Sequence, residues 1–138
     1  MKILIIEDEE DIRDFIRKAL QAQASAVDAV AEGSTGLNQA LLHDYDAVIL
    51  DLNLPDMDGL EVARKIRLRK KSMPIIVLTV EPAVEMKTKL LEICDDYVTK
   101  PFSMQELAAR LQAVLRRGPV AQDNVITVGE LVMDIKGF

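Results

Sequence analysis

The chain has 138 residues, of which 49% are hydrophobic and 29% charged, and 17 lysines and arginines against 23 aspartates and glutamates give a net charge of −6. This length suits one globular domain with an ordinary core. The acidic balance argues against nucleic-acid binding by the chain as a whole, because phosphate contacts require surplus cations. The single cysteine, Cys94, excludes an internal disulfide and a cysteine-based metal site.

The first apolar run covers residues 3–6, and acidic residues fill the next five positions. Neither a signal peptide nor a membrane span can begin with so short a run before so many charges. The sequence therefore predicts a cytoplasmic protein that makes no membrane contact. Further apolar runs occur at residues 27–31, 47–50, 75–78 and 97–98. Three of the five runs are apolar throughout, as parallel strands buried on both faces are.

Stretches of helical period separate these runs. One predicted helix collects Ile12, Phe15, Ile16, Ala19 and Leu20 on a single apolar face, and a later one collects Leu107, Leu111, Val114 and Leu115. The later helix begins with a capping box, Ser103 with Glu106, and is expected to end at Gly118. A basic run over residues 64–71 is expected to be a solvated helix face. This alternation predicts a doubly wound α/β domain, with a parallel sheet covered by helices on both faces.

Polar side chains follow the predicted strands at their carboxyl ends. Glu7 and Asp8 follow the first run, Asp51 the third, Thr79 the fourth and Lys100 the fifth. In an open parallel sheet these ends share one edge, so the five residues are expected to meet in one cleft. Three carboxylates and one ammonium carry a net charge of about −2, which a divalent cation would neutralise, and an all-oxygen set suits Mg²⁺ better than Zn²⁺ or Ca²⁺. The same groups can hold a phosphoryl group, with a carboxylate as nucleophile.

Four motifs carry a resemblance to the receiver domains of two-component response regulators, from residue 2 to about residue 117. They are Ile-Ile-Glu-Asp-Glu at 5–9, Asp-Leu-Asn-Leu-Pro-Asp-Met-Asp-Gly at 51–59, Leu-Thr at 78–79, and Asp-Asp-Tyr-Val-Thr-Lys-Pro-Phe at 95–102. The resemblance implies a flavodoxin-like sheet of five parallel strands in the order 2-1-3-4-5. It also implies that Asp51 accepts a phosphoryl group from a sensor histidine kinase, so that the chain is a signalling domain and not a turnover enzyme.

The resemblance implies a magnesium site in the cleft. Asp8 and Asp51 would bind Mg²⁺ directly, Glu7 would bind it through water, and Asn53 would offer its backbone carbonyl. In this family the cation and the phosphoryl group share the site, so these four residues are the expected metal ligands.

The resemblance also implies phosphoryl contacts and a switch. Lys100 and Thr79 would contact phosphoryl oxygens, and Tyr97 would turn inward once Thr79 moves. The Lys100-Pro101 peptide bond is expected to be cis. Phosphorylation would thereby change the face formed by the fourth helix, the fifth strand and the fifth helix.

A weaker resemblance concerns the end of the chain. Residues 126–134 resemble the opening strands of the winged-helix effector in the regulator subfamily typified by osmolarity and phosphate-starvation responders. It implies a receiver at 1–117, a linker at 118–124 and an incomplete DNA-binding domain at 125–138, so that DNA is bound only through a domain this chain lacks. Receivers of this subfamily form homodimers through the switching face. The residues expected there are Glu92, Asp95, Glu106, Arg110 and Arg117.

Departures from the family pattern leave alternatives open. Val80 replaces a small residue, so it is expected to crowd the phosphoryl site, and Pro82 is expected at the first position of the fourth helix. Ile93 replaces a helix-ending glycine, so that helix is expected to end differently. These changes allow a pseudo-receiver that dimerises without phosphorylation. A phosphatase of the haloacid dehalogenase type needs a second aspartate where Asn53 stands, and a flavin carrier needs a phosphate loop where Glu7 and its acidic neighbours stand.

Overall fold

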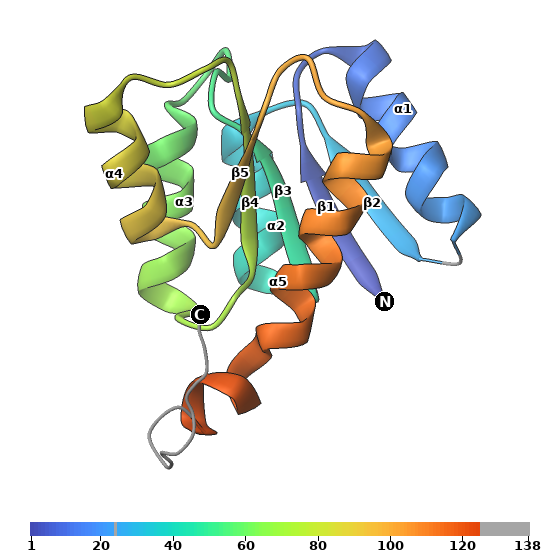
Figure 1. The fold of residues 1–138 in the computed structure, drawn as a ribbon. Coiled ribbons are helices and arrows are strands. Elements are labelled where there is room, and N and C mark those ends of the chain that lie inside the picture. Colours follow the sequence, from blue (N-terminus) through green and yellow to red (C-terminus); the bar gives the residue numbers. More distant parts are fainter. Residues whose placement is uncertain (24, 125–138) are drawn as a thin grey trace.

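The computed structural model describes residues 1–23 and 25–124, and in them five strands alternate with five helices (Figure 1). The elements are β1 (Lys2–Ile6), α1 (Glu10–Ala22), β2 (Ala26–Val30), α2 (Gly33–Leu42), β3 (Ala47–Asp51), α3 (Gly59–Arg69), β4 (Ile75–Thr79), α4 (Val84–Ile93), β5 (Asp96–Thr99) and α5 (Met104–Asn124). All neighbouring strands are parallel, in the order β2-β1-β3-β4-β5. The predicted fold class and strand order are confirmed.

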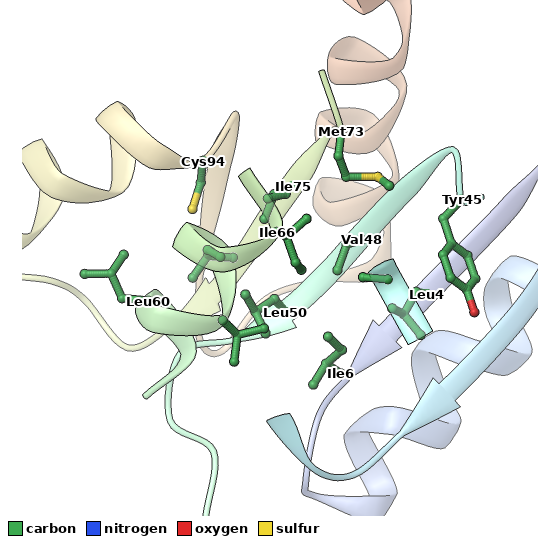
Figure 2. Close-up of a cluster of buried hydrophobic side chains, with 14 of the residues drawn as sticks. Leu4, Ile6, Tyr45, Val48, Leu50, Leu60, Ile66, Met73, Ile75 and Cys94 are labelled. Carbon is green, nitrogen blue, oxygen red and sulfur yellow. The ribbon is translucent and has the colours of Figure 1, made fainter. Parts of the chain in front are cut away.

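The central strands bury both of their faces. In β1, Leu4 and Ile6 belong to one apolar cluster, whereas Ile3 and Ile5 belong to the other, because successive side chains of a strand point to opposite faces. The first cluster lies under α2, α3 and α4, and the second lies under α1 and α5. Figure 2 shows the first cluster, in which Val48 and the other strand side chains meet those of α3. Within the described residues, none of the helices combines the length and apolarity needed to cross a membrane.

Helix α1 buries only part of its predicted apolar face. Ile16 and Leu20 are buried against the sheet, but Phe15 is 54% exposed. Phe15 thus belongs to the predicted apolar face but is not part of the buried core. Its side chain lies at the margin of the apolar face and borders a surface hollow with Ile12 and Phe102, because the space over the sheet is already filled by the two buried residues.

Helix α5 begins as predicted and ends later. The Glu106 amide donates to the Ser103 hydroxyl at 3.0 Å, which confirms the cap. The helix continues to Asn124, so the end expected at Gly118 is wrong. Gly118 and Pro119 both lie inside this helix, although they cost about 1 and about 3 kcal/mol relative to alanine there, and the packing of the preceding turns on the sheet favours the helix. The strands expected at 125–138 lie outside the described residues, and the division into receiver, linker and effector remains a prediction.

Helix α4 buries fewer residues than the other four helices: Leu90 is its one buried residue among those described. It ends at Ile93, and Cys94 follows in an extended conformation (φ −106°, ψ 162°) while its amide donates to the Leu90 carbonyl. The helix thus ends differently from a glycine-capped one, as expected, and needs no left-handed residue. The expected position of Pro82 is wrong by two residues: Ala83 is the N-cap, so Pro82 precedes the helix. Pro82 cannot occupy N1 because the helical hydrogen bonds begin with the Ala83 carbonyl.

Arg67, near the end of α3, joins three parts of the chain. Its guanidinium donates to the carbonyls of Ile93 at 2.9 Å, Lys71 at 2.8 Å and Met73 at 2.7 Å, and to the Asp95 carboxylate at 2.9 Å. Its side chain is only 25% exposed. The expectation of a solvated basic face is therefore wrong for Arg67, because the planar guanidinium satisfies carbonyls that the helix end and the loop leave free.

Asp95 also points into the molecule. Its carboxylate accepts the Ile75 amide at 2.7 Å in addition to the Arg67 guanidinium. Asp95 was expected on a dimer face, but in this structure its carboxylate is engaged within the chain, between the start of β4 and the end of α3. The pair therefore fastens the end of α4 to the sheet.

Replacing Arg67 should test this arrangement. Arg67→Ala leaves several carbonyls without a donor and the half-buried Asp95 carboxylate with only the Ile75 amide, so the free energy of unfolding should fall by about 2–3 kcal/mol. Arg64→Ala is the matched control. Among the residues the structure describes, Arg64 makes only an exposed 3.5 Å ion pair with Glu61, so its loss should change stability by less than about 0.5 kcal/mol. Urea unfolding measures both, and similar small losses would contradict the role given to Arg67.

Candidate functional site

Four strands place polar residues at one edge of the sheet. Glu7 directly follows β1, while Asp51 and Thr79 are the last residues of β3 and β4. Thr79 is in register with Thr99, so Lys100 follows at the same level. The strand order reverses between β1 and β3, which is the position where open α/β sheets bind ligands. The structure therefore brings together the residues that the sequence predicted to meet.

Three carboxylates gather at this position. One oxygen each from Glu7, Asp8 and Asp51 lies within 4.8 Å of the others. Glu7 and Asp51 are buried, whereas Asp8 is exposed. Like charges at this separation repel each other, so the cluster requires cations or protons to balance it.

Lys100 lies between two of the carboxylates. Its Nζ is 3.3 Å from Asp51 Oδ1 and 3.4 Å from Glu7 Oε1. Burial lowers the pKa of Lys100, but the two carboxylates together raise it by more, so its net pKa is above the ordinary value and the ammonium form persists. The Lys100-Pro101 peptide bond is cis, as predicted.

Glu7 has a free oxygen inside the protein. Its Oε2 accepts the Glu9 amide at 3.1 Å, but Oε1 is buried and accepts no hydrogen bond within the described residues. Burial, together with the neighbouring Asp51 carboxylate, raises the pKa of Glu7 to about 7. The Lys100 ammonium lies 3.4 Å from this oxygen without a hydrogen bond, so part of the cost of burying the oxygen remains for a further cation or a water to offset. This observation, with the all-oxygen donor set, shows that the residues fit Mg²⁺.

The loop from β3 to α3 is held close to Asp51. The Asn53 amide donates to Asp51 Oδ1 at 3.2 Å, and the Gly59 amide donates to the Leu52 carbonyl at 2.9 Å. A Cβ on Gly59 would lie 2.4 Å from the Asp51 carbonyl oxygen, so only glycine fits there. Asp58 caps α3 by accepting the amide of Leu60. The Leu-Pro-Asp-Met-Asp-Gly segment thus wraps tightly behind the phosphoacceptor candidate.

Thr79 and Tyr97 occupy the other side of the cleft. The buried Thr79 hydroxyl donates to the Val80 carbonyl at 3.0 Å. Tyr97 is half-buried and packs against the cluster that contains Leu90. Val80 is 58% exposed and lines a hollow shared with Lys100. Its side chain therefore stands on the rim of the cleft, and whether it crowds a phosphoryl group remains a prediction.

One contact at the site was not expected from the sequence. Arg13 Nη1 donates to the carbonyl of Glu7 at 3.0 Å and to that of Asp8 at 3.4 Å, so α1 holds the acidic turn from behind. A cation so close to the beginning of a helix opposes the helix dipole. In the sequence, this unfavourable position near the start of a helix was the one indication that the Arg13 side chain has a partner outside the helix.

The face expected to form dimers carries a charge cluster of its own. Arg110 Nη1 lies 3.2 Å from an Asp96 oxygen, and Arg110 Nε lies 3.3 Å from Glu106 Oε2. These residues come from β5 and α5, so they form one patch. Two further expected residues, Glu92 and Arg117, are exposed. Asp96 also belongs to this patch, and a dimer face formed by Glu92, Asp95, Glu106, Arg110 and Arg117 remains a prediction.

The fold and the acidic cleft place this chain among α/β domains with a ligand site at the carboxyl ends of a parallel sheet, and the comparison with known families identifies the family. The sequence matches the model of the response regulator receiver domain over residues 3–112. The chain belongs to this family.

Individual relatives extend the comparison. The chain is 41% identical over 136 residues to the cell cycle response regulator CtrA of Brucella ovis, which covers 98% of this chain and 59% of that protein. The chain thus spans little more than half the length of the curated relatives it matches. Among solved structures, chemotaxis protein CheY4 of Vibrio cholerae is 31% identical with a TM-score of 0.77, over 82% of this chain and 97% of that one.

A second solved structure bears on the metal. The receiver domain of sensor histidine kinase PA1611 from Pseudomonas aeruginosa is 31% identical with a TM-score of 0.75, and the match covers 83% of this chain and 97% of that one. That domain holds a magnesium ion in its active site cleft. The Glu7, Asp8 and Asp51 cluster is consistent with Mg²⁺.

The pKa of Glu7 predicts a pH-dependent stability. Without Mg²⁺, the folded-state value of about 7 exceeds the ordinary 4.5, so the stabilisation from the protonated form is complete below pH 4.5 and is lost as the pH rises through 7. Glu7→Gln cannot ionise and should lack this decrease of about 3 kcal/mol in the free energy of unfolding. Thermal unfolding of both proteins in EDTA across this pH range measures the difference. The same pH dependence in both would contradict the raised pKa.

Proposed function

We propose that this chain is the phosphoacceptor module of a two-component response regulator, and that Asp51 receives the phosphoryl group from a histidine of a sensor kinase. The observation that carries the proposal is the position of Asp51: its carboxylate lies at the strand crossover, 3.3 Å from the Lys100 ammonium and beside two further carboxylates. A nucleophilic carboxylate next to a fixed cation is the arrangement that phosphoryl transfer requires.

Four residues would hold Mg²⁺ in this proposal. Asp8 and Asp51 would bind it directly, Glu7 through water, and Asn53 through its backbone carbonyl. When bound, the ion supplies positive charge that offsets the carboxylates and the phosphoryl oxygens. The exposed Asp8 lies on the solvent side of the cleft, which allows entry of the ion.

The transfer itself needs little covalent chemistry from the protein. An Asp51 oxygen attacks phosphorus, the phosphorus–nitrogen bond of the phosphohistidine breaks, and the electron pair remains on the imidazole. Lys100 offsets the charge on one phosphoryl oxygen. The Thr79 hydroxyl would leave the Val80 carbonyl and donate to a second phosphoryl oxygen, and the Tyr97 side chain would then turn inward. These two movements would shift the equilibrium between two conformations of the domain.

The output proposed for this switch is a homodimer that controls transcription. The patch formed by Asp96, Glu106 and Arg110 lies on β5 and α5, where a two-fold axis would let each charge meet its opposite on a second copy. Glu92 and Arg117 would extend this face. The resemblance of residues 126–134 to a winged-helix effector supports DNA binding through that further domain and not through the receiver.

Two other functions are less well supported. A haloacid dehalogenase-type phosphatase would need an acid at Asn53, which is an amide. A pseudo-receiver that dimerises without phosphorylation would not need the complete set of Glu7, Asp8, Asp51 and Lys100, yet these residues lie together.

Phosphorylation can be tested directly. Incubation with acetyl phosphate and Mg²⁺ should add one phosphoryl group, which intact-mass spectrometry detects. Asp51→Asn removes the nucleophile with little change in shape and should abolish the addition, whereas Asp44→Asn, at an exposed carboxylate remote from the cleft, should not. Absence of any phosphorylation in the unchanged protein would favour the pseudo-receiver.

The dimer face has its own test. With beryllofluoride as a phosphoryl mimic and Mg²⁺, sedimentation velocity should show a shift from monomer to dimer. Arg110→Ala removes a cation from the proposed face and should weaken the dimer by about tenfold, equivalent to about 1.4 kcal/mol. Lys18→Ala removes an exposed cation from α1 and should have no effect. If the mimic leaves the monomer–dimer balance unchanged, the proposed face is wrong.

A further inference from the structure

Helix α2 begins without a cap of its own. Its N-cap residue, Glu32, makes no side-chain hydrogen bond to the helix. The first amides of a helix need acceptors from elsewhere. Here they come from the loop between β3 and α3: one Asp56 oxygen accepts the Gly33 amide at 2.8 Å, and the other accepts the Ser34 amide at 3.0 Å. A residue more than 20 positions later in the chain thus caps α2.

The electrostatics favour this contact. The amides of Ser34 and Gly33 hold the pKa of Asp56 below its usual range, so its carboxylate remains charged. A negative charge at the beginning of a helix is also stabilised by the helix dipole. Both oxygens are used, which fixes the direction of the side chain as well as its distance.

The N-terminal end of α2 also packs closely against the loop between β3 and α3 and against the first turns of α3. A Cβ on Gly33 would lie 3.1 Å from Met57 Cβ and 3.2 Å from both Leu54 Cδ1 and Val62 Cγ2. Leu54 and Met57 in turn pack against the buried cluster under the sheet. Apolar contacts therefore hold the loop from inside, while Asp56 fastens its outer side to α2.

The fastened loop carries a proposed metal ligand. Its base is closed by the bridge between Asn53 and Asp58 and by the hydrogen bond from Gly59 to Leu52. Asp56 lies in the part of the loop between these contacts. Asn53, Asp56 and Asp8 border one hollow of about 690 Å³.

We propose that Asp56 is a positioning residue for the magnesium site: by capping α2 from the β3–α3 loop, it fixes the place of the Asn53 backbone carbonyl. This inference rests on the proposed function, in which that carbonyl binds the ion. Mg²⁺ demands nearly ideal octahedral geometry with short ligand distances, so a small displacement of one carbonyl lowers the affinity. Loss of groups that orient metal ligands typically weakens metal binding by about 10–100-fold. Because the Asn53 carbonyl is also fixed at the base of its loop, loss of Asp56 should weaken Mg²⁺ binding by less than this, about three- to tenfold.

Linkage adds a second consequence. If the cap on α2 favours the metal-bound loop, bound metal must favour the cap by the same factor. Addition of Mg²⁺ should therefore slow hydrogen exchange at the amides of Gly33 and Ser34. Neither residue belongs to the proposed ligand set, so a merely structural cap would not respond to the ion.

The experiment combines calorimetric Mg²⁺ titration with amide exchange by NMR. Asp56→Ala should raise the Mg²⁺ dissociation constant about three- to tenfold and speed exchange at both amides. Asp56→Asn loses the charge but keeps one oxygen that can accept an amide of α2, so its affinity for Mg²⁺ should lie between those of Asp56→Ala and the unchanged protein. Glu9→Gln is the control for charge alone, because Glu9 is exposed beside the cleft and its side chain makes no hydrogen bond within the described residues.

The outcomes separate this inference from the proposed function. Equal losses of affinity in Asp56→Ala, Asp56→Asn and Glu9→Gln would mean that only charge matters, and would overturn the positioning role. Unchanged affinity in Asp56→Ala, or amide exchange that does not respond to Mg²⁺, would overturn it too. Failure of the unchanged protein to bind Mg²⁺ would instead overturn the metal site of the proposed function, and the positioning role with it.

Discussion

The Lys100 ammonium lies between two carboxylates that the sheet itself buries, and the function proposed for the domain depends on this contact. Glu7 and Asp51 are fixed by the ends of β1 and β3, and Lys100 by the end of β5. One cation cannot balance the three acids of the cleft when all are ionised, so the fold alone leaves an excess of negative charge there unless Glu7, whose pKa is raised to about 7, takes up a proton. Such an excess is unfavourable for stability and is typical of a site built for a cation and an anion together.

The surroundings of this contact are held from several sides. Gly59 allows the backbone of α3 to approach the Asp51 carbonyl, and Arg13 holds the acidic turn after β1. The other side of the cleft is less constrained, because in the part of the chain that the structure describes the Thr79 hydroxyl bonds only to the Val80 carbonyl, and Tyr97 is half-buried. A site with one fixed and one adjustable side can perform a transfer and then change shape.

Much of the fold was readable from the sequence, because the apolar runs at 3–6, 47–50 and 75–78 are strands buried on both faces. The meeting of Glu7, Asp8, Asp51, Thr79 and Lys100 followed from parallel strands sharing an edge, whereas the strand order and the individual roles came with the family resemblance. The contacts of Arg67 and Asp56 could not be read in this way. Each joins segments that are distant along the chain, and local periodicity carries no information about such pairs. Phe15 shows the same limit, since periodicity gives the face of a helix but not how much sheet lies beneath it.

The sparse packing of α4 has a consequence for how this domain can diverge. Leu90 is the residue that this helix buries, and its end is fastened through the Ile93 carbonyl by a side chain of α3. Most side chains of α4 can therefore change without disturbing the core or the cleft. Duplicate copies of such a domain can acquire different partners through mutations on this helix while their acidic cleft stays the same.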